Sequence, residues 1–150
     1  MDTTILTDPF IWVYNDVVPP EKCQEIIDRF NKDDRAYQGI TESGVDLNIK
    51  NSKDLLLSVH DDWKDIDKYF SELVSHLYVE YCNHLINYKQ YENFNDNPAV
   101  SLSPNFVGDV YTDTGYQIQR TEPGKGYVWH HDYSPARIMT FILYLNTVDE

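Results

Sequence analysis

The sequence predicts an α+β fold in which helices come first and β-structure follows. Apolar residues recur with helical spacing in two stretches of the first part of the chain, around residues 23–30 and 66–85. From residue 99 onward, glycines separate runs that are rich in β-prone residues. A chain with helices in one half and strands in the other packs its helices against a sheet or barrel. The length of 150 residues fits one domain.

The first two elements expected along the chain are a strand and a helix. Residues 10–14 form a short apolar run that stops at Asn15 and Asp16, which is typical of a strand. Pro19 and Pro20 then open a helix, because proline is tolerated in the first helical turn. One face of this helix is predicted to be buried, and it consists of Cys23, Ile26, Ile27 and Phe30.

A loop and a long helix are expected next. Residues 31–53 show no sustained period, which predicts a loop with room for a short strand, and we expect residues 37–55 to close over a substrate. The long helix is predicted from Trp63 to Tyr88. Its apolar stripe consists of Ile66, Phe70, Leu73, Leu77, Tyr81 and Leu85. Strands are expected after it at residues 116–121, 127–132 and 137–146.

The composition excludes several classes of protein. The net charge is −13 and is spread along the chain, so nucleic acid and anionic membranes are not expected as partners. Twelve tyrosines and three tryptophans argue against a disordered chain. The sequence shows no signal peptide and no apolar run of about 20 residues, and Cys23 and Cys82 fit no metal-binding spacing. We expect a cytoplasmic protein with buried, reduced thiols.

The most informative segment ends in His130, His131 and Asp132. Residues i and i+2 of a strand share a face, so His130 and Asp132 are expected to project together, with His131 on the other face. An imidazole and a carboxylate side by side are two members of the 2-His-1-carboxylate triad that binds Fe(II). Three residues make a weak motif, and the alternative is a strand end that carries polar residues by chance.

The surroundings of this motif resemble the prolyl 4-hydroxylase type of 2-oxoglutarate- and Fe(II)-dependent dioxygenases. The similarity extends over residues 116–146, and residues 11–23 also look like the family's opening strand and helix. The matching residues are Pro123, Gly124, Lys125, Gly126, Tyr127, His130, Asp132, Arg137, Thr140, Tyr144, Leu145 and Asn146.

The resemblance implies helices that support a double-stranded β-helix, or jelly-roll. Residues 1–150 would form a single oxygenase domain, with mostly helical support over residues 1–98 and the first core strands over residues 99–150. The family uses Fe(II), with 2-oxoglutarate as cosubstrate and ascorbate as an optional addition. The expected reaction hydroxylates a C–H bond, by default in a prolyl residue of a peptide or protein, and small molecules are the other substrate class.

The resemblance also assigns roles to individual residues. His130 and Asp132 would be iron ligands, and no catalytic residue is predicted beyond them. Tyr144 would donate a hydrogen bond to the distal carboxylate of 2-oxoglutarate. Tyr127 and Arg137 match positions on the substrate side. The plain alternatives are a core aromatic for Tyr144 and a solvated strand start for Arg137.

The sequence departs from the family after Asp132. The family has a second histidine downstream and then a Lys or Arg that pairs with the cosubstrate, whereas no histidine follows Asp132 here and no basic residue follows Arg137. We therefore expect the chain to hold only the first half of the jelly-roll, and the 150 residues to be inactive alone. The alternative is a non-catalytic jelly-roll binding module with an incomplete metal site.

Three upstream residues could in principle complete a metal site. His76, Glu80 and His84 lie at i, i+4 and i+8, so one face of the long helix could present them together. Because they flank the apolar stripe, we expect a solvated or half-buried edge of the helix instead.

Overall fold

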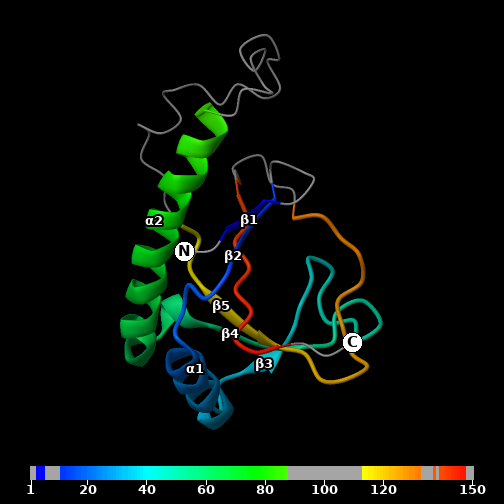
Figure 1. The fold of residues 1–150 in the computed structure, drawn as a ribbon. Coiled ribbons are helices and arrows are strands. Elements are labelled where there is room, and N and C mark those ends of the chain that lie inside the picture. Colours follow the sequence, from blue (N-terminus) through cyan, green and yellow to red (C-terminus); the bar gives the residue numbers. More distant parts are fainter. Residues whose placement is uncertain (1–2, 6–10, 88–112, 133–136, 138, 148–150) are drawn as a thin grey trace. The chain divides into compact units, whose positions relative to one another are not determined.

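The computed structural model describes residues 3–5, 11–87, 113–132, 137 and 139–147 (Figure 1). The chain divides into two compact units, one of residues 1–17 and 68–114, the other of residues 18–67 and 115–150. The elements are, in order, β1 (Thr3–Ile5), β2 (Trp12–Tyr14), α1 (Pro20–Lys32), β3 (Tyr37–Gln38), β4 (Lys53–Leu56), the 3₁₀ turns η1 (Leu57–Val59) and η2 (Asp61–Trp63), α2 (Lys64–Asn87) and β5 (Gln117–Arg120).

The first unit combines the β1–β2 pair with most of α2. The two strands are antiparallel, with Ile5 opposite Trp12. The Trp12 ring meets Tyr81 of α2 edge-on at 5.6 Å, and the Tyr14 hydroxyl donates to the Leu77 carbonyl at 3.3 Å. Burial, together with the negative charge of Glu80, raises the pKa of Tyr14 to about 12. These aromatic contacts place the short β-pair against the apolar stripe of α2.

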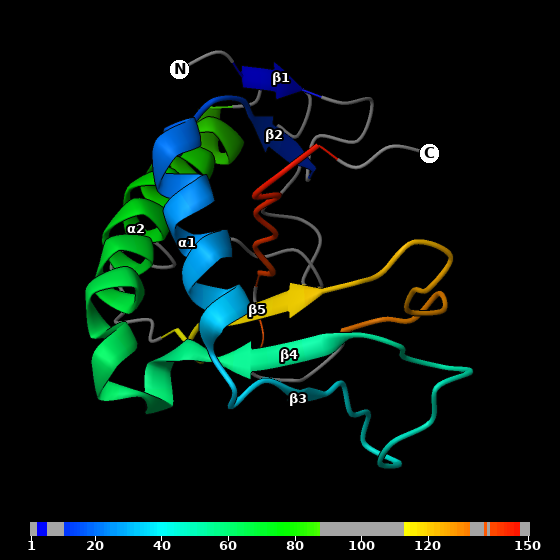
Figure 2. The ribbon, with the colours of Figure 1, turned by 90° about the horizontal axis from the view of Figure 1, so that it is seen from below.

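The second unit is built on a three-stranded antiparallel sheet in the order β3-β4-β5 (Figure 2). The central strand β4 pairs with β5 over four residues, with Leu55 opposite Ile118, and both of these side chains are buried. The end of α1 lies against β5, because Arg120 donates to Asn31 at 2.9 Å and covers the Phe30 ring. The apolar core of this unit also includes Ile26, Leu57 and Trp63, all with no exposed surface.

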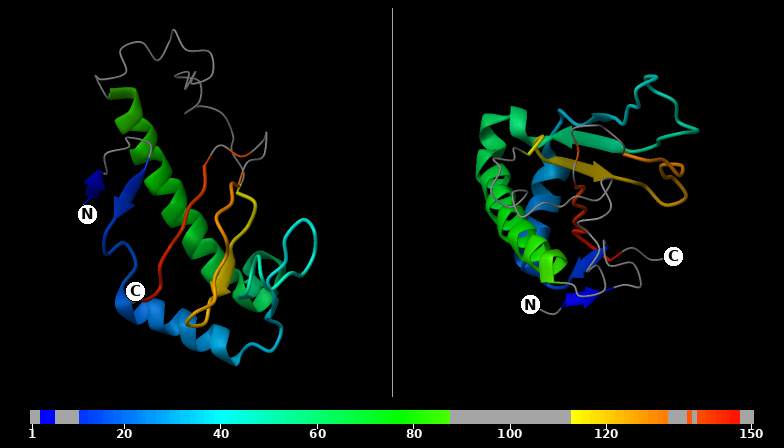
Figure 3. Two further views of the ribbon diagram at one scale, coloured as in Figure 1. Left: turned by 90° about the vertical axis from the view of Figure 1, so that its right-hand side faces the viewer. Right: turned by 90° about the horizontal axis from the view of Figure 1, so that it is seen from above.

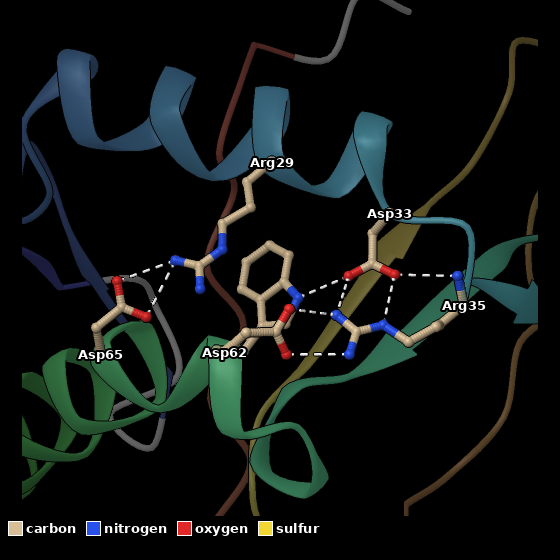
Figure 4. Close-up of polar contacts among 6 residues, drawn as sticks. Arg29, Asp33, Arg35, Asp62 and Asp65 are labelled. Carbon is tan, nitrogen blue, oxygen red and sulfur yellow. Dashed lines mark hydrogen bonds and ion pairs between the residues drawn. The ribbon is translucent and has the colours of Figure 1, made fainter.

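A cluster of charged residues lies where α1 ends, and it consists of Arg29, Asp33, Arg35, Asp62 and Asp65 (Figure 4). The Trp63 indole N–H donates to Asp33 Oδ2 at 2.8 Å, and the Arg29 guanidinium lies 4.3 Å from the centroid of the Trp63 ring. Arg35 donates to both Asp33 and Asp62, at 2.6 and 2.7 Å in the closest contacts. The hydrogen bonds from Arg35 and then from Trp63 hold the pKa of Asp33 well below its usual range. The cluster therefore links the end of α1 to η2 within one unit.

The structure confirms the α+β class and both helices. Helix α1 begins at Pro20 and buries Ile26 and Phe30, while α2 lies within one residue of the predicted bounds. Strand β2 and the short strand in the loop, β3, are also present. Strand β4 was not predicted, because its Lys53 and Asp54 resemble loop residues.

The jelly-roll and two of its expected strands are not seen in the part of the chain that the structure describes. The sheet there is three-stranded and open. Residues 128–132 and the described residues of 137–146 are not in strands, and Tyr127 makes only an isolated bridge to Lys50. The exposed Ile142 and Tyr144, at 74% and 72%, show why the pattern misled: apolar, β-prone residues form a strand only when a neighbouring strand satisfies their backbone.

The buried tryptophan and an exposed one offer a matched test of the core. Trp63→Ala should lower the free energy of unfolding by about 3–5 kcal/mol, because it leaves a cavity and removes one of the hydrogen bonds that Asp33 accepts. Trp129 is fully exposed, so Trp129→Ala should change it by less than about 0.5 kcal/mol. Guanidinium unfolding followed by far-UV circular dichroism measures both, and equal losses would contradict the assigned core.

Asp33 should contribute to the pH dependence of stability. Its folded pKa lies below the unfolded value of about 3.9, so its contribution is complete above that value and disappears as the pH falls toward the folded pKa. Asp33→Asn should therefore destabilise the protein at pH 7, and this difference from wild type should shrink toward pH 2. Urea midpoints across that range measure it, with the exposed Asp34→Asn as control. A constant difference would refute the assignment.

Candidate functional site

The segment that carries the candidate ligands leaves β5 and turns back toward residues 49–51. Pro123 and Gly124 form the corner: the Lys125 N–H donates to the Glu122 carbonyl at 2.9 Å, and Gly124 has a φ of 72°. This is the position at which a type II turn needs glycine after proline. The loop from β5 and the loop into β4 extend from the same end of the sheet (Figures 2 and 3).

Two backbone hydrogen bonds join these loops beside Tyr127. The Val128 N–H donates to the Ile49 carbonyl, and the Asn51 N–H donates to the Gly126 carbonyl, both at 2.9 Å. Tyr127 and Lys50 are consequently paired across an isolated antiparallel bridge. After this bridge the chain bends at Trp129 and continues to the His-x-Asp motif.

His130 and Asp132 lie side by side, although not on a strand. The distance between His130 Nε2 and Asp132 Oδ1 is 3.6 Å, and both side chains are partly exposed. Ligand atoms bind a metal ion at about 2.0–2.2 Å each, so two atoms on one ion stand at most about 4.4 Å apart. The separation of these two atoms is therefore compatible with a shared metal ion.

A hydrogen bond orients the imidazole of His130 for such a role. Its Nδ1 lies 2.9 Å from the carbonyl oxygen of Val128. A carbonyl oxygen only accepts hydrogen bonds, so Nδ1 carries the hydrogen. In the neutral ring the lone pair then resides on Nε2, the atom nearest to Asp132. The backbone of the same loop thus selects the tautomer that a metal ligand needs.

Tyr127 and Arg137 join the same group of side chains. The Tyr127 ring stacks on His130, with centroids 3.6 Å apart and planes 17° from parallel. Arg137 donates to the Asp132 carbonyl at 3.0 Å, and its guanidinium is 3.5 Å from Asp132 Oδ1. The structure therefore brings together the predicted ligands and the two residues predicted on the substrate side.

The structure does not bring Tyr144 to this group. Its side chain is 72% exposed, and no hydrogen bond or ring contact joins it to the other predicted site residues in the described part of the chain. His131 is exposed. The upstream pair His76 and Glu80 is 3.3 Å apart on α2 with both side chains largely exposed, which fits the expected solvated edge; the side chain of His84 lies outside the described residues.

A buried polar network lies next to Tyr127, in a part of the chain where the sequence predicts no site residue. Lys50, Ser52 and Asp54 are 7%, 3% and 1% exposed, and all three share one set of hydrogen bonds with Gln117. The available signal was their spacing, since residues at i, i+2 and i+4 of an extended chain face the same side. Lys50 and Ser52 fall in the loop that the sequence predicts over residues 31–53, so this alternation does not stand out in the sequence.

Among the described residues, no group of three or more His, Cys, Asp and Glu side chains could hold a metal ion. His130 and Asp132 consequently fit the metal as two ligands of an incomplete set. Comparisons with protein-family models, with curated proteins and with solved structures found no match for this chain. None of the described helices is both long and apolar enough to cross a membrane.

An open groove lies over the charged cluster of α1 and η2. Its lining includes Glu25, Arg29, Asp33, Arg35 and Trp63. The two arginines there already pair with carboxylates of the cluster, at 2.9 Å for Arg29 with Asp65 and 2.6 Å for Arg35 with Asp33. Both arginines of the groove are therefore already engaged, so we interpret the groove as structural.

The paired ligands predict which histidine contributes to metal binding. His130→Ala should weaken Mn(II) binding by more than the roughly tenfold loss expected of an outer contact, because it removes a donor atom. His131→Ala changes an exposed neighbour and should leave the affinity unchanged. Titration of Mn(II) followed by electron paramagnetic resonance measures both variants. A loss on His131→Ala equal to that on His130→Ala would contradict the assigned ligand.

Proposed function

We propose that the protein is a 2-oxoglutarate- and Fe(II)-dependent dioxygenase that hydroxylates a C–H bond in a prolyl residue of a peptide or protein. One observation carries the proposal: His130 Nε2 and Asp132 Oδ1 converge to 3.6 Å, with Nδ1 of the same ring held by a carbonyl. The resemblance of residues 116–146 to the prolyl 4-hydroxylase type supports it independently.

The donor set fits the metal in part. A neutral imidazole and a carboxylate are two-thirds of the set that binds Fe(II) in such enzymes and leaves positions open. Bound iron and 2-oxoglutarate supply the oxidising chemistry. No third ligand completes the set among the described residues. The sequence has no Lys or Arg after Arg137 that would match the family's basic anchor for the cosubstrate. We also propose that the open three-stranded sheet forms part of a jelly-roll.

The residues around the ligand pair have distinct tasks in this proposal. Tyr127 covers one face of the imidazole, which restricts its rotation and keeps water from that face. Arg137 holds the Asp132 carbonyl, and with 40% of its side chain exposed it offers the remaining N–H groups to an anionic ligand. Tyr144 keeps its proposed role at the distal carboxylate of 2-oxoglutarate, and that role requires its exposed ring to become covered.

A non-catalytic binding module is the second candidate. The contact of 3.5 Å between Arg137 and Asp132 Oδ1 favours it, because an arginine beside the carboxylate competes with a metal cation for the same oxygen. The acidic net charge of −13 supports neither candidate over the other, but it argues against a nucleic-acid substrate for both. For both candidates we propose a cytoplasmic location, in line with the free thiols of Cys23 and Cys82.

Turnover by the full-length protein distinguishes the two candidates. Succinate should form only when Fe(II) and 2-oxoglutarate are both supplied, and chelation of the metal should abolish it. His130→Ala and Asp132→Asn should each lower the rate at least a hundredfold, about the upper range for loss of an outer contact. The exposed neighbour His131→Ala is the matched control and should retain the rate. Metal-independent turnover, or full activity of His130→Ala, would refute the proposed dioxygenase function.

A further inference from the structure

The buried network beside the candidate site is centred on the carboxylate of Asp54. Lys50 Nζ and Gln117 Nε2 donate to its Oδ2 at 2.7 and 3.1 Å, and Ser52 Oγ donates to its Oδ1 at 2.8 Å. The Lys50 and Asp54 side chains are only 9% and 2% exposed. A buried ion pair adds little net stability, because both charges lose their hydration. Stability alone therefore does not explain this ion pair, and positioning a neighbouring side chain is a role that fits it.

The group that the lysine reaches is the ring of Tyr127. The ammonium of Lys50 lies 5.2 Å from the centroid of that ring, within the range of a cation–π contact. The backbone of the two residues is paired through the hydrogen bonds of Ile49 and Asn51 described above. Tyr127 in turn stacks on His130. A continuous series of contacts thus runs from the central strand β4 to the imidazole.

Close packing restricts the lysine side chain further. Gly39 follows β3 and is hydrogen-bonded through its N–H to the Ser52 carbonyl at 2.9 Å. A Cβ atom at Gly39 would stand 2.9 Å from Lys50 Cε and 3.2 Å from Asp54 Oδ2. The chain therefore passes directly over the ion pair, and the lysine stem has no room to move toward that side.

We propose that Lys50 and Asp54 are positioning residues for the candidate metal ligand His130. The ion pair fixes the ammonium against the Tyr127 ring, and the ring fixes the plane of the imidazole. The inference rests on the proposed function for its purpose, since the orientation of His130 matters chemically when the imidazole binds a metal. Its structural content, the dependence of the Tyr127–His130 stack on the ion pair, is testable without any metal.

The test is proton magnetic resonance of the His130 imidazole in the metal-free full chain. An aromatic ring stacked on the imidazole shifts its C–H resonances upfield, and His130→Gln assigns them. The double variant Lys50→Met/Asp54→Asn removes both buried charges together, so that neither is left unpaired. We expect its His130 resonances to move to the positions found in Tyr127→Ala.

Two controls and a second variant keep the test decisive. Lys22→Met breaks the more exposed pair with Glu25, and Tyr127→Phe retains the ring, so both should leave the His130 resonances in place. If circular dichroism shows the double variant unfolded, Lys50→Gln/Asp54→Asn replaces it, because the two neutral amides can still hydrogen-bond to each other while the ammonium is gone. A folded variant with wild-type His130 resonances would overturn the proposal.

Mn(II) binding separates this inference from the proposed function. If both hold, the double variant should bind Mn(II) about ten- to a hundredfold more weakly than wild type, as expected for contacts that orient a ligand. Loss of the stack in a protein that binds no Mn(II) at His130 supports the positioning role and overturns the metal site. Mn(II) binding at His130 in a double variant with an unchanged Tyr127–His130 stack supports the metal site and overturns the positioning role.

Discussion

The second unit depends on one constraint, the need to satisfy a carboxylate that is almost completely removed from water. Asp54 is 1% exposed on the central strand of the sheet, and an unpaired charge at that position would cost several kcal/mol. Its partners come from both sides: Lys50 and Ser52 precede β4, and Gln117 begins β5. One side chain therefore fixes the approach to β4 and its alignment with the neighbouring strand.

The ion pair of the buried network and the ion pairs of the charged cluster at the end of α1 differ in what determines their energy. The Lys50–Asp54 pair is enclosed, so its energy depends on the match of donors to acceptors and little on salt. The pairs of Arg35 with Asp62 and of Arg29 with Asp65 are largely exposed, and pairs of that kind contribute little each. Asp33 stands between these cases, because its carboxylate is 7% exposed and also accepts from the buried indole of Trp63.

Features with a local cause could be predicted from the sequence. The periodic apolar positions of α1, the proline at its start and the turn at Gly124 each depend on residues a few positions apart. Strand β4 depends on distant residues as well as local ones, because it pairs with β5 and because Gln117, 63 positions away in the chain, completes the partners of the buried Asp54. The strand predicted over residues 137–146 is the opposite case. Their composition is typical of a strand, but composition alone does not provide the neighbouring strand that a sheet requires.

The candidate ligand pair combines both kinds of cause. The alternation of a strand was the reason to expect His130 and Asp132 on one face, yet the chain bends at Trp129 and is not a strand there. The two side chains meet because a spacing of two residues keeps them close in a bent segment as well, and because Val128 holds Nδ1 of the ring. The spacing is therefore a local property of the motif. The plane of the imidazole is set by Tyr127, and the place of Tyr127 is set by Lys50, which lies far from it in sequence. A short motif can thus identify the donors, whereas their orientation depends on a buried charge elsewhere in the sheet.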